Sequence, residues 1–233
     1  MKPPTKMTRR TFMAAAGGSM VAIGLPGVFV KLTAADNRAL AAELRPDGRP
    51  RIPPGQHAVK ALSDMGGVPG AGRTPEWRLV ITGAVKKPTT LTFADLLKLP
   101  QASQTCDVHC VTGWTLLDSR WQGVSLQTIM EAANVDRQAG YVVFEAPGDY
   151  SSSIPIADVH KGNVLLAHGF SGQPLPPAHG APLRALVPDR YFYKSVKWVR
   201  RIKFTIEDEP GYYETRGYSN SADPWKEERF DDG

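Results

Sequence analysis

Both cysteines of the chain lie in one short stretch, as Cys106 and Cys110. Cys110 ends an alternating, strand-like run and opens onto the turn Gly113-Trp114, from which a sulfur atom can face a bound group. A thiolate is a soft ligand that suits soft or high-valent metals. Two alternatives remain open at this point. Cys110 could be a buried thiol that acts as a small hydrophobic residue, or the two cysteines could form a disulfide.

A second group of residues combines basic side chains with a glycine-proline turn and two strand ends. It comprises His179, Arg184, Lys194, Ser195 and Lys197. Arginine offers a planar fork to a phosphate and lysine a point charge, so this cluster suits an anionic ligand. A solvated basic edge strand would have the same composition, because lysines on an edge discourage aggregation.

The charge of the chain is concentrated at its beginning. The chain has 233 residues, 42% of them hydrophobic, which suffices for a substantial core in one large domain. The whole formal charge of +5 is carried by residues 1–35, where there is no acid, and the remainder sums to zero. A basic face for nucleic acid or for a membrane surface is therefore not supported.

Residues 1–35 have the pattern of a twin-arginine export signal. The pair Arg9-Arg10 precedes Phe12, and an uncharged run from Thr11 to Val30 follows, interrupted by glycine and proline. These interruptions make the run a poor membrane-spanning helix, and residues 33–35 offer a cleavage point. Because this route carries folded proteins, it predicts a periplasmic protein loaded with its cofactor before export. An uncleaved anchor is the alternative.

Periodicity and turn residues predict an α+β domain with a mixed, mostly β sheet and short helices. Strands are expected at 77–83, before Cys110, and at 141–144, 164–167, 183–187 and 196–206, with helices capped by Thr92 and Ser125. Residues 36–72, rich in proline, glycine and charge, are expected to form an extended arm on a domain spanning 73–233. The aromatic tail from Pro210 is expected to pack on the surface and not to wall a pocket.

Other chemistries lack their motifs. The chain has no phosphate-binding P-loop, no dinucleotide-binding glycine pattern after a strand and no G-x-S-x-G elbow. The spacing of the two cysteines is not that of a haem attachment or thioredoxin-like motif, and the histidines lack the spacing of a zinc site.

Several dispersed motifs occur together in a characteristic order: Pro53-Pro54-Gly55-Gln56, residues 107–114, residues 120–124, residues 179–184, Val196-Lys197-Trp198, and Gly217-Tyr218 with residues 222–225. In this arrangement the chain resembles the sulfite oxidase superfamily of molybdopterin-binding oxidoreductases. The likeness is strongest to short bacterial members related to the periplasmic methionine-sulfoxide reductase catalytic subunit. It implies the sulfite oxidase-type fold and a molybdenum-molybdopterin cofactor (Moco).

The resemblance also implies residue roles at the metal. Cys110 matches the family's catalytic cysteine, which ligates molybdenum beside the two dithiolene sulfurs of the pterin. His109 and Thr112 flank it and belong to the expected cofactor-binding set. In the methionine-sulfoxide reductase branch an acid stands where this chain has Thr112. Cys106 matches no functional position and is expected to pack in the protein.

The basic cluster acquires a role in the same way. The resemblance places Arg184 and Lys197 on the pterin phosphate, and His179 with the backbone of Lys194 and Ser195 beside the pterin. An arginine that helps sulfite oxidases to bind sulfite has no identifiable counterpart in the sequence.

The implied activity is oxygen-atom transfer to or from a sulfur-centred substrate, either sulfite oxidation or S-oxide reduction. Electrons would be exchanged with a haem-containing partner, because the chain has no haem motif of its own. The alternative is a non-catalytic binding protein that keeps the fold without the metal. The retained Cys110 argues against that alternative, since a degenerate copy has no need of a thiolate.

Overall fold

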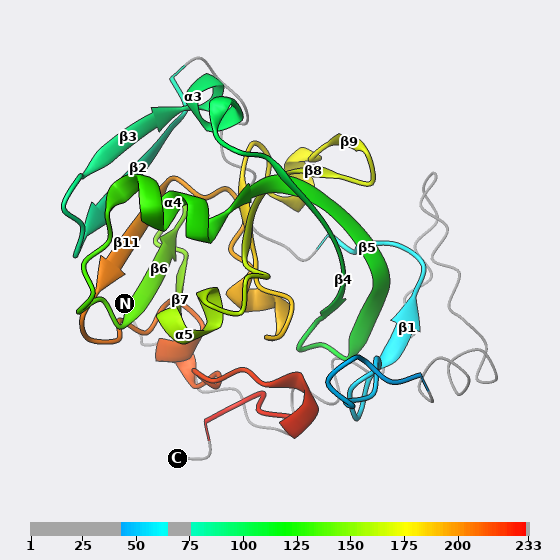
Figure 1. The fold of residues 1–233 in the computed structure, drawn as a ribbon. Coiled ribbons are helices and arrows are strands. Elements are labelled where there is room, and N and C mark those ends of the chain that lie inside the picture. The colour runs from blue at the N-terminus through cyan, green and yellow to red at the C-terminus, as the bar shows by residue number, and fades with distance from the viewer. Residues whose placement is uncertain (1–42, 65–75, 232–233) are drawn as a thin grey trace, which may run out of the picture.

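The computed structural model describes residues 43–64 and 76–231, which form two mixed β-sheets joined by short helices (Figure 1). This arrangement confirms the predicted α+β class. The predicted export signal at 1–35 and parts of the predicted arm, 36–42 and 65–72, lie outside the described residues. In the two described ranges no helix has the length and apolar character needed to cross a membrane.

The first sheet carries Cys110 at the end of one of its strands. Its members are β1 (His57–Val59), β4 (Ala102–His109), β5 (Trp114–Ser125), β8 (Leu165–Phe170), β9 (Gln173–Pro174) and β10 (Arg184–Leu186). The long strand β5 pairs antiparallel with β4, parallel with β1 at its start and antiparallel with β8 at its end. In Figure 1, β4 and β5 run together as a long curved pair. β10 pairs with β8 at the opposite end of the sheet.

The second sheet contributes one face of the largest hydrophobic cluster in the described residues. Its order is β3 (Thr89–Thr92), β2 (Arg78–Gly83), β11 (Arg201–Thr205), β6 (Tyr141–Glu145) and β7 (Ser151–Pro155). β11 pairs in parallel with β2 and antiparallel with β6. Buried side chains of β2, β6, β7 and β11 join one apolar cluster with those of α4 (Leu126–Ala133). That cluster also includes Leu183 and Ala185, so it links the second sheet to β10.

Local capping explains where the two predicted helices begin. At α3 (Phe93–Lys98) the Thr92 hydroxyl accepts a hydrogen bond from the Asp95 backbone, and the Asp95 carboxylate accepts one from the Thr92 backbone. The predicted capping box is thus confirmed. Ser125 caps α4 through the backbone N–H of Gln127, as predicted. Such caps contribute about 1 kcal/mol each. A further short helix, α5 (Ile156–Val159), was not predicted.

The predicted strand at 196–206 is wrong in its first half, because only Arg201–Thr205 forms β11. The Val196 carbonyl accepts a hydrogen bond from the backbone of Ala185, and Trp198 has a φ of 57° that no strand accommodates. Lys197 therefore lies in a bend next to β10. Strand β1 was not predicted either, because three residues are too few to show a pattern.

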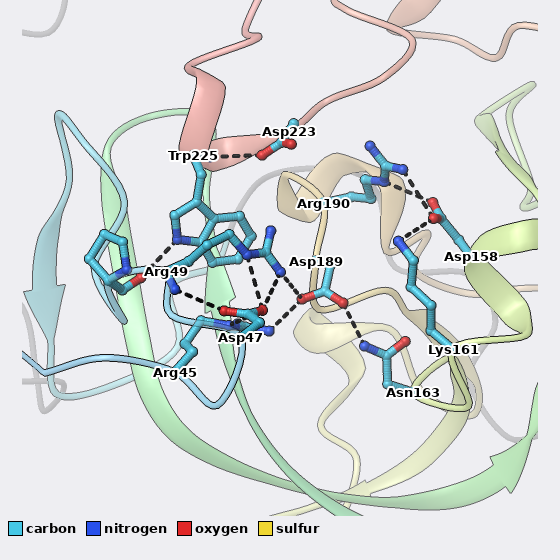
Figure 2. A network of polar contacts seen from close by, with 11 residues as sticks. Arg45, Asp47, Arg49, Asp158, Lys161, Asn163, Asp189, Arg190, Asp223 and Trp225 are labelled. Carbon is cyan, nitrogen blue, oxygen red and sulfur yellow. Dashed lines mark hydrogen bonds and ion pairs between the residues drawn. The ribbon is translucent and has the colours of Figure 1, made fainter.

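The first described residues lie against the loop after β10 and against the C-terminal tail (Figure 2). Arg45 pairs with Asp189 at 2.6 Å, and the guanidinium of Arg49 stacks 3.8 Å above the ring of Trp225. The indole of Trp225 in turn donates to the carbonyl of Pro50 at 2.8 Å. Arg51 pairs with Asp107 of β4 at 2.7 Å, which holds this segment beside the strand that leads to the cysteine.

Candidate active site around Cys110

Cys110 begins a tight turn between β4 and β5. Its backbone N–H donates to the Trp114 carbonyl at 2.8 Å, and the Gly113 N–H donates to the Cys110 carbonyl at 3.0 Å. Gly113 has a φ of +99°, which glycine adopts without a steric penalty. Gln56 adds a third constraint, because its side-chain amide donates to the Cys110 carbonyl at 3.3 Å. Cys106 and Cys110 are both free thiols, so the disulfide alternative is excluded.

The Cys110 sulfur is almost completely shielded from water, with the residue 4% exposed. Burial raises the pKa of this thiol, and a hydrogen bond from the Thr112 hydroxyl at 3.1 Å opposes that shift. The positive charge of Arg229 also favours the thiolate. Deprotonation in such surroundings is favoured by a positive charge at the sulfur, and a metal ion supplies one.

Cys110 lines a cavity of about 130 Å³ between the first sheet, the turn before β10 and the C-terminal tail. The cavity brings together six of the eight residues that the sequence singled out: Cys110, Thr112, His179, Arg184, Ser195 and Lys197. They come from chain segments up to about 90 residues apart, so only the fold makes them neighbours. The cavity therefore has a single thiol and a group of cations on its walls.

Arg184 is the most unusual of these residues, because it is only 2% exposed. Its guanidinium donates to the carbonyls of Ser195 at 2.8 Å and His179 at 3.0 Å, and it lies 4.2 Å from the centre of the Phe192 ring. Among the described residues no carboxylate pairs with it, and burial lowers its pKa. A buried charge without a counter-charge is costly, so this site favours a negatively charged ligand. The alternative of a solvated basic edge is wrong for Arg184.

Lys197 adds a second cation to the wall of the cavity, and the imidazole of His179 lies on the same wall. The Lys197 ammonium donates to the Ala178 carbonyl at 3.1 Å, and burial together with the charge of Arg184 lowers its pKa to about 8. His179 has its Nδ1 atom 3.4 Å from the carboxylate of Asp64, and burial lowers its pKa.

Gly180 allows the turn before β10 to pack closely against Arg184 and Lys197. It has a φ of +110°, and a Cβ atom there would lie 3.0 Å from the Lys197 backbone and 3.1 Å from the Arg184 Cβ. Its carbonyl accepts from the Trp198 backbone at 3.2 Å. Only glycine allows this approach, so Gly180 sets the spacing between the two basic residues.

Part of the cavity wall is aromatic, and the sequence did not predict it. Tyr150, Tyr193, Tyr213 and Tyr218 all line the cavity, and the last two belong to the tail. The expectation that the tail packs only on the surface is therefore wrong. The density of tyrosines in that tail was the signal available in the sequence. Burial is the main cause of the raised pKa of Tyr218, and the electrostatic interaction with Cys110 adds to it.

Two predicted residues do not line the cavity. His109 is fully buried at the end of β4, and its Nδ1 atom lies 3.0 Å from the Thr115 hydroxyl. That hydroxyl donates to Gln56 at 2.6 Å, so the His109 Nδ1 atom must carry the proton. Burial lowers the pKa of His109 to about 3, which keeps the ring neutral. The ammonium of Lys194 points into the tail and bonds with Glu214.

A second and larger hollow of about 590 Å³ runs along the outer edge of β4 and contains Cys106. The Cys106 sulfur lies 3.9 Å from the Ser119 hydroxyl, and burial raises the pKa of this thiol to about 12. Such a thiol stays protonated and is a poor ligand and nucleophile. The chemistry therefore belongs to the smaller cavity, despite the size of this hollow.

Residues 65–213 match the family described as oxidoreductase molybdopterin binding domain. The chain belongs to this family. It is accordingly a molybdenum-dependent oxidoreductase with the sulfite oxidase-type fold, and molybdopterin is its cofactor.

Two known relatives are similar to this chain. The uncharacterized oxidoreductase YuiH of Bacillus subtilis is 41% identical over 182 residues, which are 77% of this chain and 92% of YuiH. The methionine-sulfoxide reductase catalytic subunit MsrP of Gluconobacter oxydans is 32% identical over 152 residues, which are 58% of this chain and 48% of MsrP. The chain thus spans about half the length of this second relative.

A solved structure confirms the fold. The sulfane dehydrogenase SoxCD from Paracoccus pantotrophus superposes with a TM-score of 0.52 at 26% identity, covering 63% of this chain and 40% of the SoxCD chain.

The residues of the cavity fit the family's cofactor at both of its ends. The buried guanidinium of Arg184, which lacks a carboxylate partner among the described residues, suits a phosphate dianion. Cys110 lines the same cavity and offers a sulfur to the metal. In residues 43–64 and 76–231 no group of three His, Cys, Asp or Glu side chains could hold a metal ion. The family's cofactor needs only one protein ligand, because its dithiolene supplies two more sulfurs.

Proposed function

We propose that this protein transfers an oxygen atom to or from a sulfur-centred substrate, with Cys110 as the protein ligand of molybdenum. The observation that carries the proposal is the cavity itself, which has a shielded thiol and a buried arginine without a carboxylate partner among the described residues. The names of the relatives add support, since one acts on protein methionine sulfoxide and one on sulfane.

In this proposal the cationic residues bind the cofactor phosphate. Arg184 and Lys197 supply the positive charge that binds the phosphate. The contacts of the Arg184 guanidinium with the Ser195 and His179 carbonyls fix its direction. Because this end is buried, each charge-assisted hydrogen bond contributes about 1.5–3 kcal/mol, more than the same contact at an exposed site.

The cysteine end tunes the metal. The Thr112 hydroxyl donates to the Cys110 sulfur, which draws electron density from the thiolate and fixes its direction. Thr112 is exposed, whereas the sulfur that its hydroxyl contacts is shielded from water. When bound, the cofactor supplies two-electron redox chemistry and oxygen-atom exchange that no side chain provides.

The aromatic wall faces the same space and is suited to bind substrate. Tyr213 and Tyr218 offer hydroxyl groups that stay protonated, because burial raises the pKa of both. A neutral phenol can donate a hydrogen bond to an oxygen on sulfur, and its ring can contact a methyl or methylene group beside that sulfur.

The overall reaction balances in either direction. Sulfite and water give sulfate, two protons and two electrons. An S-oxide with two protons and two electrons gives a thioether and water. A haem-containing redox partner is proposed for these electrons, because the two cysteines of the chain do not form a haem attachment motif.

The test is an assay of holoenzyme purified from its native route, with sulfite and ferricyanide in one arm and methionine sulfoxide and reduced viologen dye in the other. Turnover in either arm, lost in Cys110→Ser, is the expected result. Protein that contains molybdenum and turns over neither substrate would refute a sulfur-centred reaction. Protein that carries no molybdenum would favour the non-catalytic binding protein.

We also propose a periplasmic location for a domain spanning 73–233, with 1–35 as the twin-arginine signal and 36–72 as its arm. The support is the Arg9-Arg10 pair in the sequence. Replacing both arginines by lysine should trap the precursor in the cytoplasm, as fractionation and immunoblotting would show. An unchanged periplasmic fraction would exclude this route.

A further inference from the structure

Two opposite charges are completely buried where the C-terminal tail meets β7. The Lys194 ammonium lies 2.6 Å from the Glu214 carboxylate, and both side chains are 1% exposed. Burial lowers the pKa of Lys194, and the contact with Glu214 opposes that shift. Burying two charges is costly even when they are paired, and hydrophobic residues of similar size often fold as well. A pair kept at this cost is a candidate for a role in function.

The ammonium group of Lys194 has no hydrogen-bond donor left for a cofactor. An ammonium offers three N–H donors. Those of Lys194 have three acceptors, namely Glu214 at 2.6 Å, the Asn220 side chain at 3.0 Å and the Ser153 carbonyl at 3.0 Å. The side chain also does not line the cavity, unlike its neighbours Tyr193 and Ser195. A contact between its ammonium and a phosphate would require these bonds to break.

The three acceptors show what Lys194 holds together. Ser153 belongs to β7 in the second sheet, whereas Glu214 and Asn220 lie in the tail. The two tail residues flank Tyr218, and Glu214 directly follows Tyr213. The Ser152 hydroxyl reinforces the join by donating to the Glu214 carboxylate at 2.5 Å. One side chain thus fixes both ends of the tail segment that faces the cavity.

The two tail tyrosines depend on this fixation for their place in the wall. Their ring centroids are 5.0 Å apart, and the ring of Tyr193 lies 5.7 Å from Tyr213 and 5.5 Å from Tyr218. Tyr193 adjoins Lys194 in the chain, so the rings and the ion pair form one continuous cluster. Tyr193, Tyr213 and Tyr218 line the same cavity as Cys110, so this cluster shares the space next to the sulfur.

We propose that Lys194 and Glu214 are positioning residues, which set the tail tyrosines opposite Cys110 so that the Tyr218 hydroxyl reaches the substrate. Only its last step, in which the Tyr218 hydroxyl reaches the substrate, rests on the proposed function. Retention of the tail and binding of the cofactor can be measured without any substrate.

The experiment uses the double variant Lys194→Met/Glu214→Leu of the holoenzyme, which removes both charges and leaves neither unpaired. The matched control is Lys203→Gln/Glu209→Gln, a pair 2.7 Å apart that is exposed. The measurements are molybdenum and pterin per folded chain, hydrogen exchange of the amides at 211–220, and kinetic constants with sulfite or methionine sulfoxide.

The proposal predicts cofactor content within about twofold of wild type, at least tenfold faster exchange at 211–220 and at least tenfold lower kcat/KM. In a Tyr218→Phe background the same double change should lower kcat/KM by less than about twofold, because the effects of residues that act as a unit are not additive. The control pair should change none of these quantities.

Two results would overturn the assignment. Loss of the cofactor with unchanged exchange at 211–220 would make Lys194 a cofactor-binding residue. An equal loss of kcat/KM with and without the Tyr218 hydroxyl would show that the pair does not act through that group. If neither substrate turns over even in wild type, the sulfur-centred function fails, while exchange and cofactor content still decide whether the pair holds the tail.

Discussion

Replacement of Arg184 by glutamine separates cofactor binding from folding. The substitution keeps a polar side chain of similar reach but removes the charge and the fork. At a buried site, losing the charge-assisted hydrogen bond to the phosphate reduces the binding free energy by about 1.5–3 kcal/mol. At about 1.36 kcal/mol per factor of ten, the cofactor should bind about 10- to 150-fold more weakly.

Folding of the cofactor-free protein should respond differently. Arg184→Gln loses hydrogen bonds to three backbone carbonyls, but it also removes a buried charge with no carboxylate partner among the described residues. These effects oppose one another, so we expect a net change of about 1 kcal/mol or less and a Tm shift of at most about 2–4 °C.

The assay is molybdenum and pterin content per folded chain, measured beside thermal unfolding of the cofactor-free protein. Lys203→Gln is the control, because Lys203 lies on β11 and pairs with Glu209 at the surface. If Arg184→Gln kept its cofactor while Lys203→Gln lost it, the phosphate site would lie elsewhere.

Two more predictions concern the same end of the cavity. Gly180→Ala should destabilise the fold by about 1–2 kcal/mol through its left-handed backbone and should also lower cofactor content. Gly172→Ala is the control, because Gly172 has a φ of +77° and nothing within 4 Å of the added Cβ atom. It should lower the stability to thermal unfolding by a similar amount but keep the cofactor. Equal losses of cofactor in the two variants would refute a role for the close contacts of Gly180 with Lys197 and Arg184. Because the pKa of Lys197 is about 8, cofactor binding above that pH must take up a proton, so affinity should fall by up to about tenfold per pH unit there. Pterin fluorescence released between pH 7 and 9.5 measures this, and a slope that survives in Lys197→Gln would assign it to another group.

The sequence predicted the elements whose signals are local. The capping box at Thr92 and the periodic apolar face of α4 depend on residues within a few positions of each other, and both are present. The strand expected at 196–206 failed in its first half because Val196 bonds with Ala185 on β10, a contact that no local pattern reports. Lys197 thereby lies in a bend, although it still reaches the cavity with Arg184.

The candidate site was predictable where family motifs mark it and not where the tail folds back. Cys110, Arg184 and Lys197 lie together as the resemblance implies, and their roles toward the cofactor remain predictions. The side chain of Lys194 faces the tail instead, because Glu214 lies within 2.6 Å of its ammonium. Tyr218 was missed as a wall residue because its place depends on that long-range pair.

X-ray absorption at the molybdenum edge tests the central claim most directly, because it counts the sulfur neighbours of the metal. The holoenzyme should show the sulfur of Cys110 together with the dithiolene sulfurs of the pterin. Cys110→Ser, loaded with cofactor, should show one sulfur neighbour fewer per molybdenum, and Cys106→Ser should match wild type. An unchanged sulfur count in Cys110→Ser would contradict the assignment of Cys110 as the metal ligand.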